Sequence, residues 1–286
     1  MNKIIINKTV KLTILFILTN SILLLFQSCQ SNKSKSEKYK DLDDQLLYEN
    51  FIEVEQTGVN YKIPSPMEMF IFLKKADAPF LNNKTHKTQK CINYISKKEK
   101  AINFGIYSAD LAYCSVFGDF QQTLIYFKTI KQLADNLGLH EGFGKQMATR
   151  IDKNLTNIDS LMEISADSYY KANRFMEEQG QTDIMGLMLV GGWIEGLYLA
   201  IESVNDINNS PITERIADQQ VLLENLLGYL QKNQNSDDII KVIQDLEQLQ
   251  EVFDELYFND ENTIITKNQF VNITNGVKSL RNIYIN

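Results

Sequence analysis

The chain has 286 residues, of which 44% are hydrophobic and 23% are charged, and its formal net charge is −7. This length suffices for one large helical domain or two small ones. The acidic balance argues against a nucleic-acid-binding protein and against adsorption to an anionic membrane surface, because both need clustered positive charge.

The first 28 residues have the pattern of a bacterial lipoprotein signal peptide. Their first part carries three lysines, at positions 3, 8 and 11. A mostly apolar stretch over residues 12–26 follows, and the segment ends directly before Cys29. This order predicts cleavage before Cys29, whose lipid, with palmitate among its acyl chains, would anchor the protein in a membrane. A retained N-terminal anchor and a secretory signal cut elsewhere are the alternatives.

Removal of residues 1–28 leaves 258 residues with 26 basic and 36 acidic side chains, a net charge near −10. Residues 29–40 are rich in Ser and Lys and are predicted to be a polar tether. Residues 41–286 are predicted to form a single helical domain. Its two cysteines, Cys91 and Cys114, could form a disulfide in an oxidising envelope or stay buried as free thiols.

The first clear helix start comes at Ser65. Residues 41–61 predict no definite element, although residues 46–54 could form a short helix. Ser65 can cap a helix, Pro66 suits its first turn, and Glu68 can close a capping box. The helix is expected to continue to about residue 75.

The next stretch predicts a hairpin of two antiparallel helices. Ser96 and Glu99 form a second capping box, which opens a helix that ends at Gly118. Asp119 caps a helix with apolar residues at helical spacing, which ends before Gly138. A short helix ending near residue 154 and a longer one over residues 157–179 are expected to follow.

Three more helices are predicted beyond residue 203, and no segment has a convincing strand pattern. Ser210 with Pro211 starts the first, which is expected to continue through Leu230. Ser236 caps the second, whose apolar residues approach a seven-residue repeat. Thr266 closes a capping box with the glutamine three residues later and opens the last helix.

Residues 182–203 are the most apolar part of the chain after the signal peptide. From residue 184 to residue 201 every position is apolar or glycine except Glu195. Such a run could span a membrane or form a buried central helix. Its four glycines suit close approach by another helix, and the neighbouring amphipathic helices need an apolar partner. We therefore predict a buried, glycine-rich central helix.

The predicted fold class is all-α. We expect an irregular multi-helix bundle of antiparallel helix hairpins around the central helix. A short α-solenoid, a repeat-like stack of helix pairs, is the alternative.

The sequence carries few residues suited to catalysis. No motif typical of a metal, phosphate or nucleophile site is present, and no metal or cofactor is predicted. The two histidines, His86 and His140, are interpreted as solvated loop residues. Asp159-Ser160-Leu161 resembles a short O-glycosylation acceptor, which makes Ser160 a candidate modification site.

Two carboxylates in apolar surroundings are the main candidates for function. Asp110 and Glu195 must be paired, neutral or close to water. One hypothesis is a ligand pocket in which they orient a polar ligand among aromatic side chains. The alternative is a structural polar network. The candidate ligand-binding residues are Tyr107, Asp110, Trp193, Glu195 and Tyr198.

Four segments together resemble a group of uncharacterised helical envelope lipoproteins from Bacteroidetes. They are IPSPMEMF at 63–70, INFGIYSADLAY at 102–113, FKTIKQLADNLGL at 127–139 and GGWIEGLYLA at 191–200. The resemblance covers most of residues 60–285. It implies an all-helical domain in a Gram-negative envelope and carries no assigned activity.

These patterns favour a non-enzymatic lipoprotein, tethered through Cys29 to the outer membrane and facing the periplasm or the cell surface. Its domain would bind an envelope protein or a small ligand. A carboxylate-dependent hydrolase with Asp110 and Glu195 as its acid and base is the second hypothesis. A purely structural adaptor, the third, predicts an exposed apolar groove on a helix face.

Overall fold

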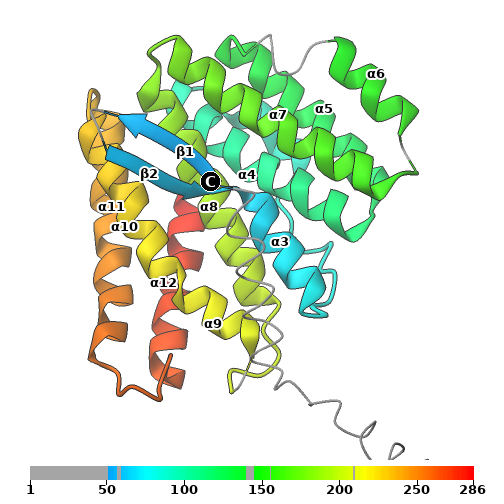
Figure 1. Ribbon diagram of the computed structural model, residues 1–286. Coiled ribbons are helices and arrows are strands. Elements are labelled where there is room, and N and C mark those ends of the chain that lie inside the picture. Colours follow the sequence, from blue (N-terminus) through cyan, green and yellow to red (C-terminus); the bar gives the residue numbers. More distant parts are fainter. Residues whose placement is uncertain (1–50, 57–58, 140–144, 155, 209) are drawn as a thin grey trace, which may run out of the picture. The chain divides into compact units, whose positions relative to one another are not determined.

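The computed structural model describes residues 51–56, 59–139, 145–154, 156–208 and 210–286, which belong to one compact unit. The predicted signal peptide, the tether, Cys29 and His140 lie outside these ranges. Within them the chain forms ten α-helices, two short 3₁₀ helices and one β-hairpin (Figure 1). The all-α fold class predicted for the domain is confirmed, with the hairpin as an addition.

The hairpin consists of β1 (Phe51–Gln56) and β2 (Val59–Pro64), which pair antiparallel. Phe51 lies opposite Pro64, and β2 packs beside α10. No strand is expected from the sequence, and the helix suggested over residues 46–54 is wrong for residues 51–54; residues 46–50 lie outside the described ranges. Apolar and polar residues alternate from Ile52 to Glu55 in β1 and from Val59 to Ile63 in β2, a pattern typical of strands.

The predicted hairpin of helices is confirmed as α4 (Lys97–Phe117) and α5 (Phe120–Leu137). The capping box of Ser96 and Glu99 is present, and Asp119 accepts a hydrogen bond from the backbone N–H of Gln122. Gly118 ends α4 with a φ of 81°. Glycine adopts this left-handed conformation without steric strain.

The first predicted helix is α3 (Pro66–Lys75), which is followed by the 3₁₀ helix η1 (Thr88–Asn93). Ser65 caps α3 by accepting a hydrogen bond from the backbone N–H of Met67. The expected closure of a capping box by Glu68 is wrong. This carboxylate is buried and forms an ion pair with Arg215.

The remaining elements are α6 (Lys145–Lys153), α7 (Ile158–Glu178), α8 (Thr182–Glu202), α9 (Pro211–Ala217), α10 (Gln219–Lys232), α11 (Asp237–Asp254), the 3₁₀ helix η2 (Glu255–Phe258) and α12 (Lys267–Ile285). The helix expected from Pro211 to Leu230 is divided into α9 and α10 at Asp218. The backbone of Asp218 keeps helical angles, with φ −60° and ψ −19°, so the interruption is local.

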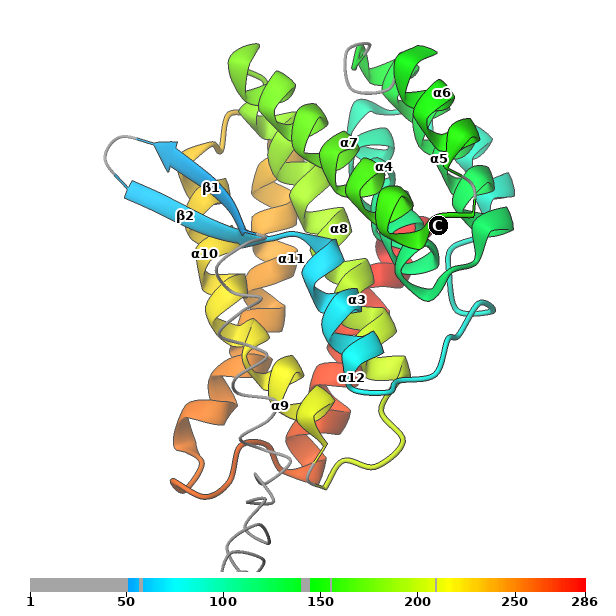
Figure 2. The ribbon, with the colours of Figure 1, turned by 45° about the vertical axis from the view of Figure 1, so that its right-hand side comes forward.

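Helix α8 is the centre of the domain, as predicted. It packs against α3, α4, α7, α9, α10, α11 and α12 (Figures 1 and 2). In a solenoid each repeat contacts only its neighbours, so this arrangement is a bundle. By length and composition α8 could cross a membrane, but 94% of its most apolar window is buried inside the domain.

Both described cysteines are free. Cys91 lies on η1 and Cys114 on α4, and both are buried. The Cys91 thiol lies 3.9 Å from the backbone oxygen of Thr129. Burial raises the pKa of both thiols, so they stay protonated at neutral pH.

Glycine lets α4 and α8 cross in direct backbone contact. A Cβ on Gly191 of α8 would overlap the backbone oxygen of Ile102, and a Cβ on Gly105 of α4 would overlap the backbone oxygen of Met188. The glycines that disfavour α8 as an isolated helix therefore allow its closest contact.

We expect Gly191→Ala to lower the free energy of unfolding by at least about 2–3 kcal/mol, because the added methyl group forces the two backbones apart. The matched control is Gly196→Ala on the same helix, where a Cβ meets nothing within 4 Å. Alanine there should stabilise by about 0.5–1 kcal/mol through helix propensity. Urea unfolding measures both values. Equal effects of the two substitutions would contradict the close crossing.

Candidate functional site

The crossing of α4 and α8 brings Asp110 and Glu195 together, as the pocket hypothesis required. Both side chains are fully buried, with 0% of their surface exposed. Their carboxyl groups are hydrogen-bonding neighbours. The backbone N–H of His86 donates to the other oxygen of Asp110, Oδ2, at 3.0 Å.

Arg281 of α12 completes this cluster by neutralising Glu195. Its Nε lies 2.5 Å from Glu195 Oε2 and its Nη2 lies 2.8 Å from Oε1, a bidentate pairing. The guanidinium also lies over the ring of Tyr198, 4.0 Å from the ring centroid. Removing one partner of such a buried pair costs about 3–5 kcal/mol, because the other charge is left unpaired.

The two carboxyls differ in protonation. Burial raises the pKa of Asp110 well above its usual value, the neighbouring Glu195 raises it further, and Arg281 opposes both effects. Burial also raises the pKa of Glu195, but there the paired Arg281 opposes the rise directly. We therefore place the shared proton on Asp110. The protonated carboxyl of Asp110 is then the donor in the side-chain hydrogen bond with Glu195.

His86 belongs to this cluster and is not the solvated loop residue expected from the sequence. Only 3% of its surface is exposed. Its Nε2 lies 2.7 Å from the hydroxyl of Tyr94, and its ring stacks on Tyr107 at 4.9 Å. The hydroxyl of Tyr126 donates to its backbone oxygen at 2.8 Å. Burial, with the charges of Arg281 and Lys90, lowers the pKa of His86 to about 3, so it is neutral at physiological pH.

A second group of charges lies next to Tyr198, towards the protein surface. Glu202 forms ion pairs with Lys84 and with Lys278, the second at 2.6 Å. Both lysines are about half-exposed, whereas the Glu202 side chain is 9% exposed. Polar groups therefore extend from the buried acid pair to the surface at the contact between α8 and α12.

The structure brings four of the five candidate ligand-binding residues into this one cluster, and Trp193 is the exception. Glu195 and Trp193 are two residues apart, which places them on different faces of a helix. Tyr107 donates to the backbone oxygen of Lys87 at 3.0 Å, so its hydroxyl already has a partner. With both carboxyls at zero exposure, the cluster has the properties of the structural polar network.

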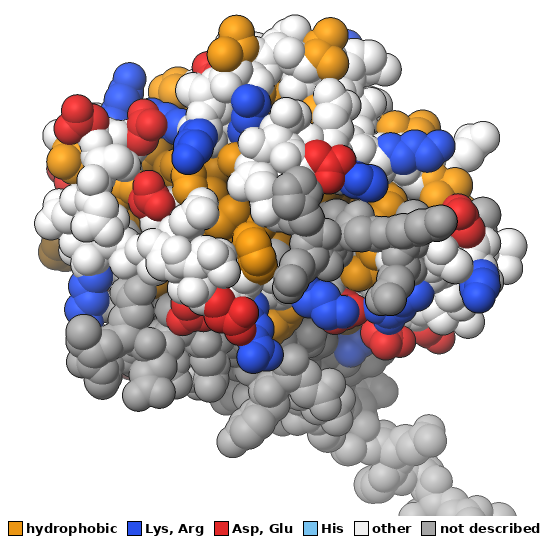
Figure 3. Space-filling view, turned by 90° about the horizontal axis from the view of Figure 1, so that it is seen from above, with side chains coloured by type: hydrophobic (Ala, Val, Ile, Leu, Met, Phe, Trp, Pro, Cys, Tyr) orange, Lys and Arg blue, Asp and Glu red, His pale blue; other side chains and the backbone are white. Residues whose placement is uncertain are grey.

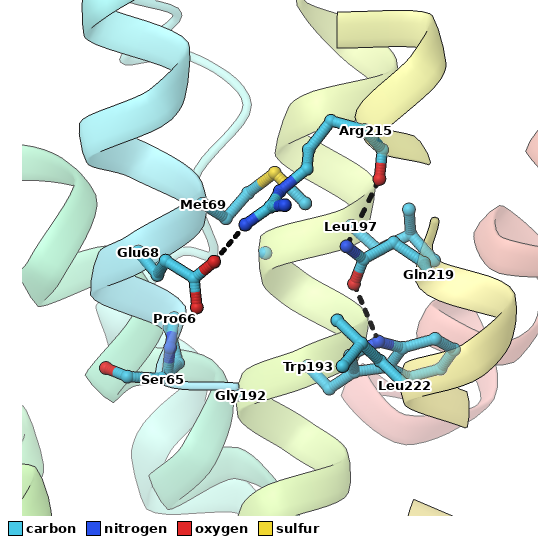
Figure 4. A pocket seen from close by; sticks show the side chains of 11 residues that line it. Ser65, Pro66, Glu68, Met69, Gly192, Trp193, Leu197, Arg215, Gln219 and Leu222 are labelled. Carbon is cyan, nitrogen blue, oxygen red and sulfur yellow. Dashed lines mark hydrogen bonds and ion pairs between the residues drawn. The ribbon is translucent and has the colours of Figure 1, made fainter. Parts of the chain in front are cut away.

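Trp193 lies at a second polar cluster, between α8, α3, α9 and α10. Its Nε1 donates to Gln219 at 3.1 Å, and Gln219 donates to the backbone oxygen of Arg215 at 3.2 Å (Figure 4). Figure 4 shows Arg215 and Glu68 pointing toward each other across the cavity. The cavity has a volume of about 20 Å³, which is room for about one water molecule.

A much larger cavity is open at the surface between α3 and α7. Its volume is about 720 Å³. The two helices lie on the same side of α4 and α8 (Figure 2). We name this cavity the α3–α7 groove, and its lining residues are Met67, Ile71, Asp159, Met162, Glu163, Ala166, Asp167, Tyr170, Lys171 and Arg174.

The candidate glycosylation residue, Ser160, lies in the first turn of α7. It is partly exposed, and its backbone N–H donates to the side chain of Asn157, which caps the helix. On the face seen in Figure 3, acidic, basic and hydrophobic side chains are interspersed over the described surface. That face therefore has no extended field of one sign within the described residues.

Comparison with known proteins identifies no relative of this chain, so the interpretation of the site depends on its geometry. No family model, no curated protein and no solved structure matches the chain. The resemblance to Bacteroidetes lipoproteins therefore remains a prediction. Among the described residues no three His, Cys, Asp or Glu side chains are placed to hold a metal ion.

Sequence reasoning identified the two acids and missed their partners. Arg281 lies on α12, where the sequence pattern indicates only an apolar stripe, and His86 lies in a polar loop. Neither pattern marks these residues as partners of the two acids. The composition gives one indication of the missing partner. The chain has only four arginines among its 29 basic residues, and arginine suits bidentate pairing with a buried carboxylate better than lysine does.

We expect Asp110→Asn to be neutral or stabilising at pH 7, because an amide can replace a protonated carboxyl. The folded-state pKa of Asp110 is raised, so its stabilising contribution is complete below the unfolded value near 4 and decreases as the pH rises. The variant should therefore gain stability relative to the wild type between pH 4 and 7, by at most about 1.4 kcal/mol per pH unit.

Urea unfolding at several pH values measures this difference. Asp135→Asn on the exposed face of α5 serves as the control, because its ion pair with Lys131 is exposed and such pairs contribute little to stability. If Asp110→Asn instead loses stability as the pH rises, Asp110 is ionised in the folded protein and the proton assignment is wrong.

Proposed function

We propose that the protein is a lipid-anchored envelope protein whose helical domain binds a partner protein at the α3–α7 groove. The observation that carries this proposal is the groove itself, an open apolar surface of the kind expected for an adaptor. The anchor is inferred from the signal-like residues 1–28 and from Cys29. Attachment to the outer membrane, on its periplasmic or its outer side, is part of the proposal.

The composition of the groove supports a binding role. Its apolar lining residues are Met67 and Ile71 from α3 and Met162, Ala166 and Tyr170 from α7. Methionine adapts its shape to a partner, and tyrosine is enriched in protein interfaces. Five charged residues form the rest of the lining, in keeping with the usual interface of an apolar centre and a polar rim.

The spacing along α7 favours an amphipathic helix as the occupant. Met162, Ala166 and Tyr170 are four residues apart and extend for about 12 Å, the length of two to three helical turns. A partner helix would place residues at positions i, i+3 or i+4, and i+7 over this row.

The rim also indicates which charges the partner helix carries. Asp159, Glu163 and Asp167 lie toward the start of α7, and Lys171 and Arg174 lie toward its end. Arg150 of α6 pairs with Asp167 at 2.6 Å and more weakly with Glu163 at 3.6 Å. Lys171 pairs with Asp167 at 2.9 Å and Arg174 pairs with Glu178 at 2.8 Å, so the basic residues of the rim are already neutralised. The carboxylates of residues 159 and 163 therefore favour a basic residue of the partner helix near the start of α7.

The burial of the acid pair makes the hydrolase hypothesis weaker. In glycoside hydrolysis the paired carboxyls are about 5 Å or more apart and open to a substrate. Asp110 and Glu195 are hydrogen-bonding neighbours without exposed surface, and Arg281 occupies Glu195. An acid–base role would require the bundle to open at this crossing, with the loss of a buried ion pair.

We expect Cys29→Ser to abolish acylation and to release the protein from the membrane fraction, because the lipid is attached through the thiol of this cysteine. Incorporation of labelled palmitate and fractionation of the envelope measure both effects. Cys91→Ala is the control, since Cys91 is buried and should leave both unchanged. Lipid incorporation into the Cys29→Ser variant would contradict the anchor.

The groove can be tested by photocrosslinking in intact cells. A photoreactive benzoyl-phenylalanine replaces Tyr170 in the groove or, as a matched control, Tyr257, which is also an exposed tyrosine but lies on η2. We expect a discrete protein adduct from position 170 and none from position 257. Ala166→Arg should abolish the adduct, because a long cationic side chain fills the groove.

An adduct that is insensitive to Ala166→Arg, or no adduct from position 170, would contradict the proposed groove. Thermal unfolding of the Ala166→Arg variant checks that the substitution leaves the fold intact. Residue 166 is only partly buried, so we expect a change of less than about 1 kcal/mol.

A further inference from the structure

A basic surface lies where η1 leads into α4. Residues 87–100 contain five lysines and one acidic residue, Glu99, whereas the whole chain has 29 basic and 36 acidic residues. Lys90 donates to the side chain of Asn286 at 2.6 Å, so this surface lies beside the C-terminus marked in Figure 2. We name it the basic patch, and its lysines are Lys87, Lys90, Lys97, Lys98 and Lys100. It shares no residue with the lining of the α3–α7 groove.

Neighbouring acids do not neutralise the basic patch. Among the described residues, none of its five lysines forms an ion pair with an acidic side chain. Glu99, the one acid within the patch, accepts hydrogen bonds from the backbone N–H groups of Ile95 and Ser96, each at 2.9 Å. The patch therefore presents positive charge on a protein that is acidic as a whole.

The start of α4 is an unfavourable place for positive charge. Lys97, Lys98 and Lys100 lie within its first four positions, where the free backbone N–H groups and the helix dipole already give a partial positive charge. Acidic residues are favoured there, and α11 does begin with Asp237 and Asp238. The three lysines oppose the dipole of α4, so the stability of the helix does not explain them.

Two isoleucines of the patch lie almost entirely in solvent. Ile92 is 76% exposed and Ile95 is 82% exposed. A hydrophobic residue directly before a helix cap commonly packs on the fourth helical residue, but in α4 that residue is Lys100, and Ile95 stays exposed. Cys91 and Tyr94 are buried and hold the segment on the bundle. The segment is therefore fixed with its two isoleucines outward.

Exposed cationic and apolar side chains together match a lipid surface with anionic headgroups. Lysine attracts the phosphates, and a large apolar side chain enters the boundary between headgroups and acyl chains. A nucleic-acid strand suits the patch less well, because stacking of bases needs an exposed aromatic ring and Tyr94 is 7% exposed. The acidic charge of the rest of the chain does not prevent the contact, since charges beyond about 8–10 Å are largely screened at physiological salt.

We propose that the basic patch binds the anionic headgroups of a lipid bilayer, with Ile92 and Ile95 inserted at its surface. The inference rests on the proposed lipid anchor, which would keep the domain close to a membrane. The predicted tether leaves the domain free to rotate, and the patch would hold one end of the bundle against the bilayer.

The test is photocrosslinking of the full chain in vesicles of equal parts of phosphatidylglycerol and phosphatidylcholine. Benzoyl-phenylalanine replaces Ile95 or, as a matched control, Ile240, an exposed isoleucine of α11. We expect lipid adducts from position 95, detected by mass spectrometry, and at least about fivefold fewer from position 240. Vesicles of phosphatidylcholine alone should lower the yield from position 95 by at least about fivefold, the effect of one lysine at an anionic surface.

Lys97→Gln combined with Lys98→Gln should lower the lipid adduct from position 95 by about tenfold or more, because two contacts with headgroups are lost. This variant should be at least as stable as the wild type in urea unfolding, since neutral residues suit the start of a helix better than lysines. Lys241→Gln combined with Lys267→Gln removes the same charge from exposed positions outside the patch and should leave the yield unchanged.

Equal yields from positions 95 and 240 would overturn the proposal, and so would a yield from position 95 that the paired substitution at 97 and 98 does not change. In intact cells, a protein adduct from position 95 in place of a lipid adduct would assign the patch to an acidic protein instead. Failure of the anchor is seen separately, as lipid incorporation into the Cys29→Ser variant, whereas the adduct from position 95 reports only the contact of the patch.

Discussion

The ion pair between Glu195 and Arg281 is the interaction on which the arrangement of the bundle depends. It joins the central helix α8 to the last helix, α12, in a place where Glu195 has no exposed surface and Arg281 is only 7% exposed. A buried charge is tolerated only when it is paired and hydrogen-bonded, so the two helices have one favourable register. Asp110 extends the same constraint to α4, because its proton makes it a donor to Glu195 rather than a second negative charge.

A second buried pair repeats this solution on another face of α8. Glu68 and Arg215 join α3 to α9 next to Trp193. The central helix is therefore apolar along most of its length, with a polar contact on each of two faces. Apolar packing alone allows helices to slide or rotate with little change in free energy. The two ion pairs remove that freedom, and the glycines of α8 set how closely α4 can approach.

The buried charged residues are paired with one another inside the bundle, so a candidate binding surface must lie elsewhere. The α3–α7 groove lies at the surface, between the short helix α3 and α7. This arrangement is that of a bundle with a binding surface on its outside, whereas the enclosed acid pair joins helices in the interior.

The sequence by itself determined most of the helices, several of their caps and the burial of α8, because these depend on local spacing and on composition. The capping boxes at Ser96 and Thr266 and the helix end at Gly118 could be predicted from the sequence for that reason. It also singled out Asp110 and Glu195, since a carboxylate in an apolar helix needs a partner. Only the tertiary structure decided which partners they have. Arg281 is 86 residues from Glu195 along the chain, and such pairings follow from helix packing, which local spacing does not encode.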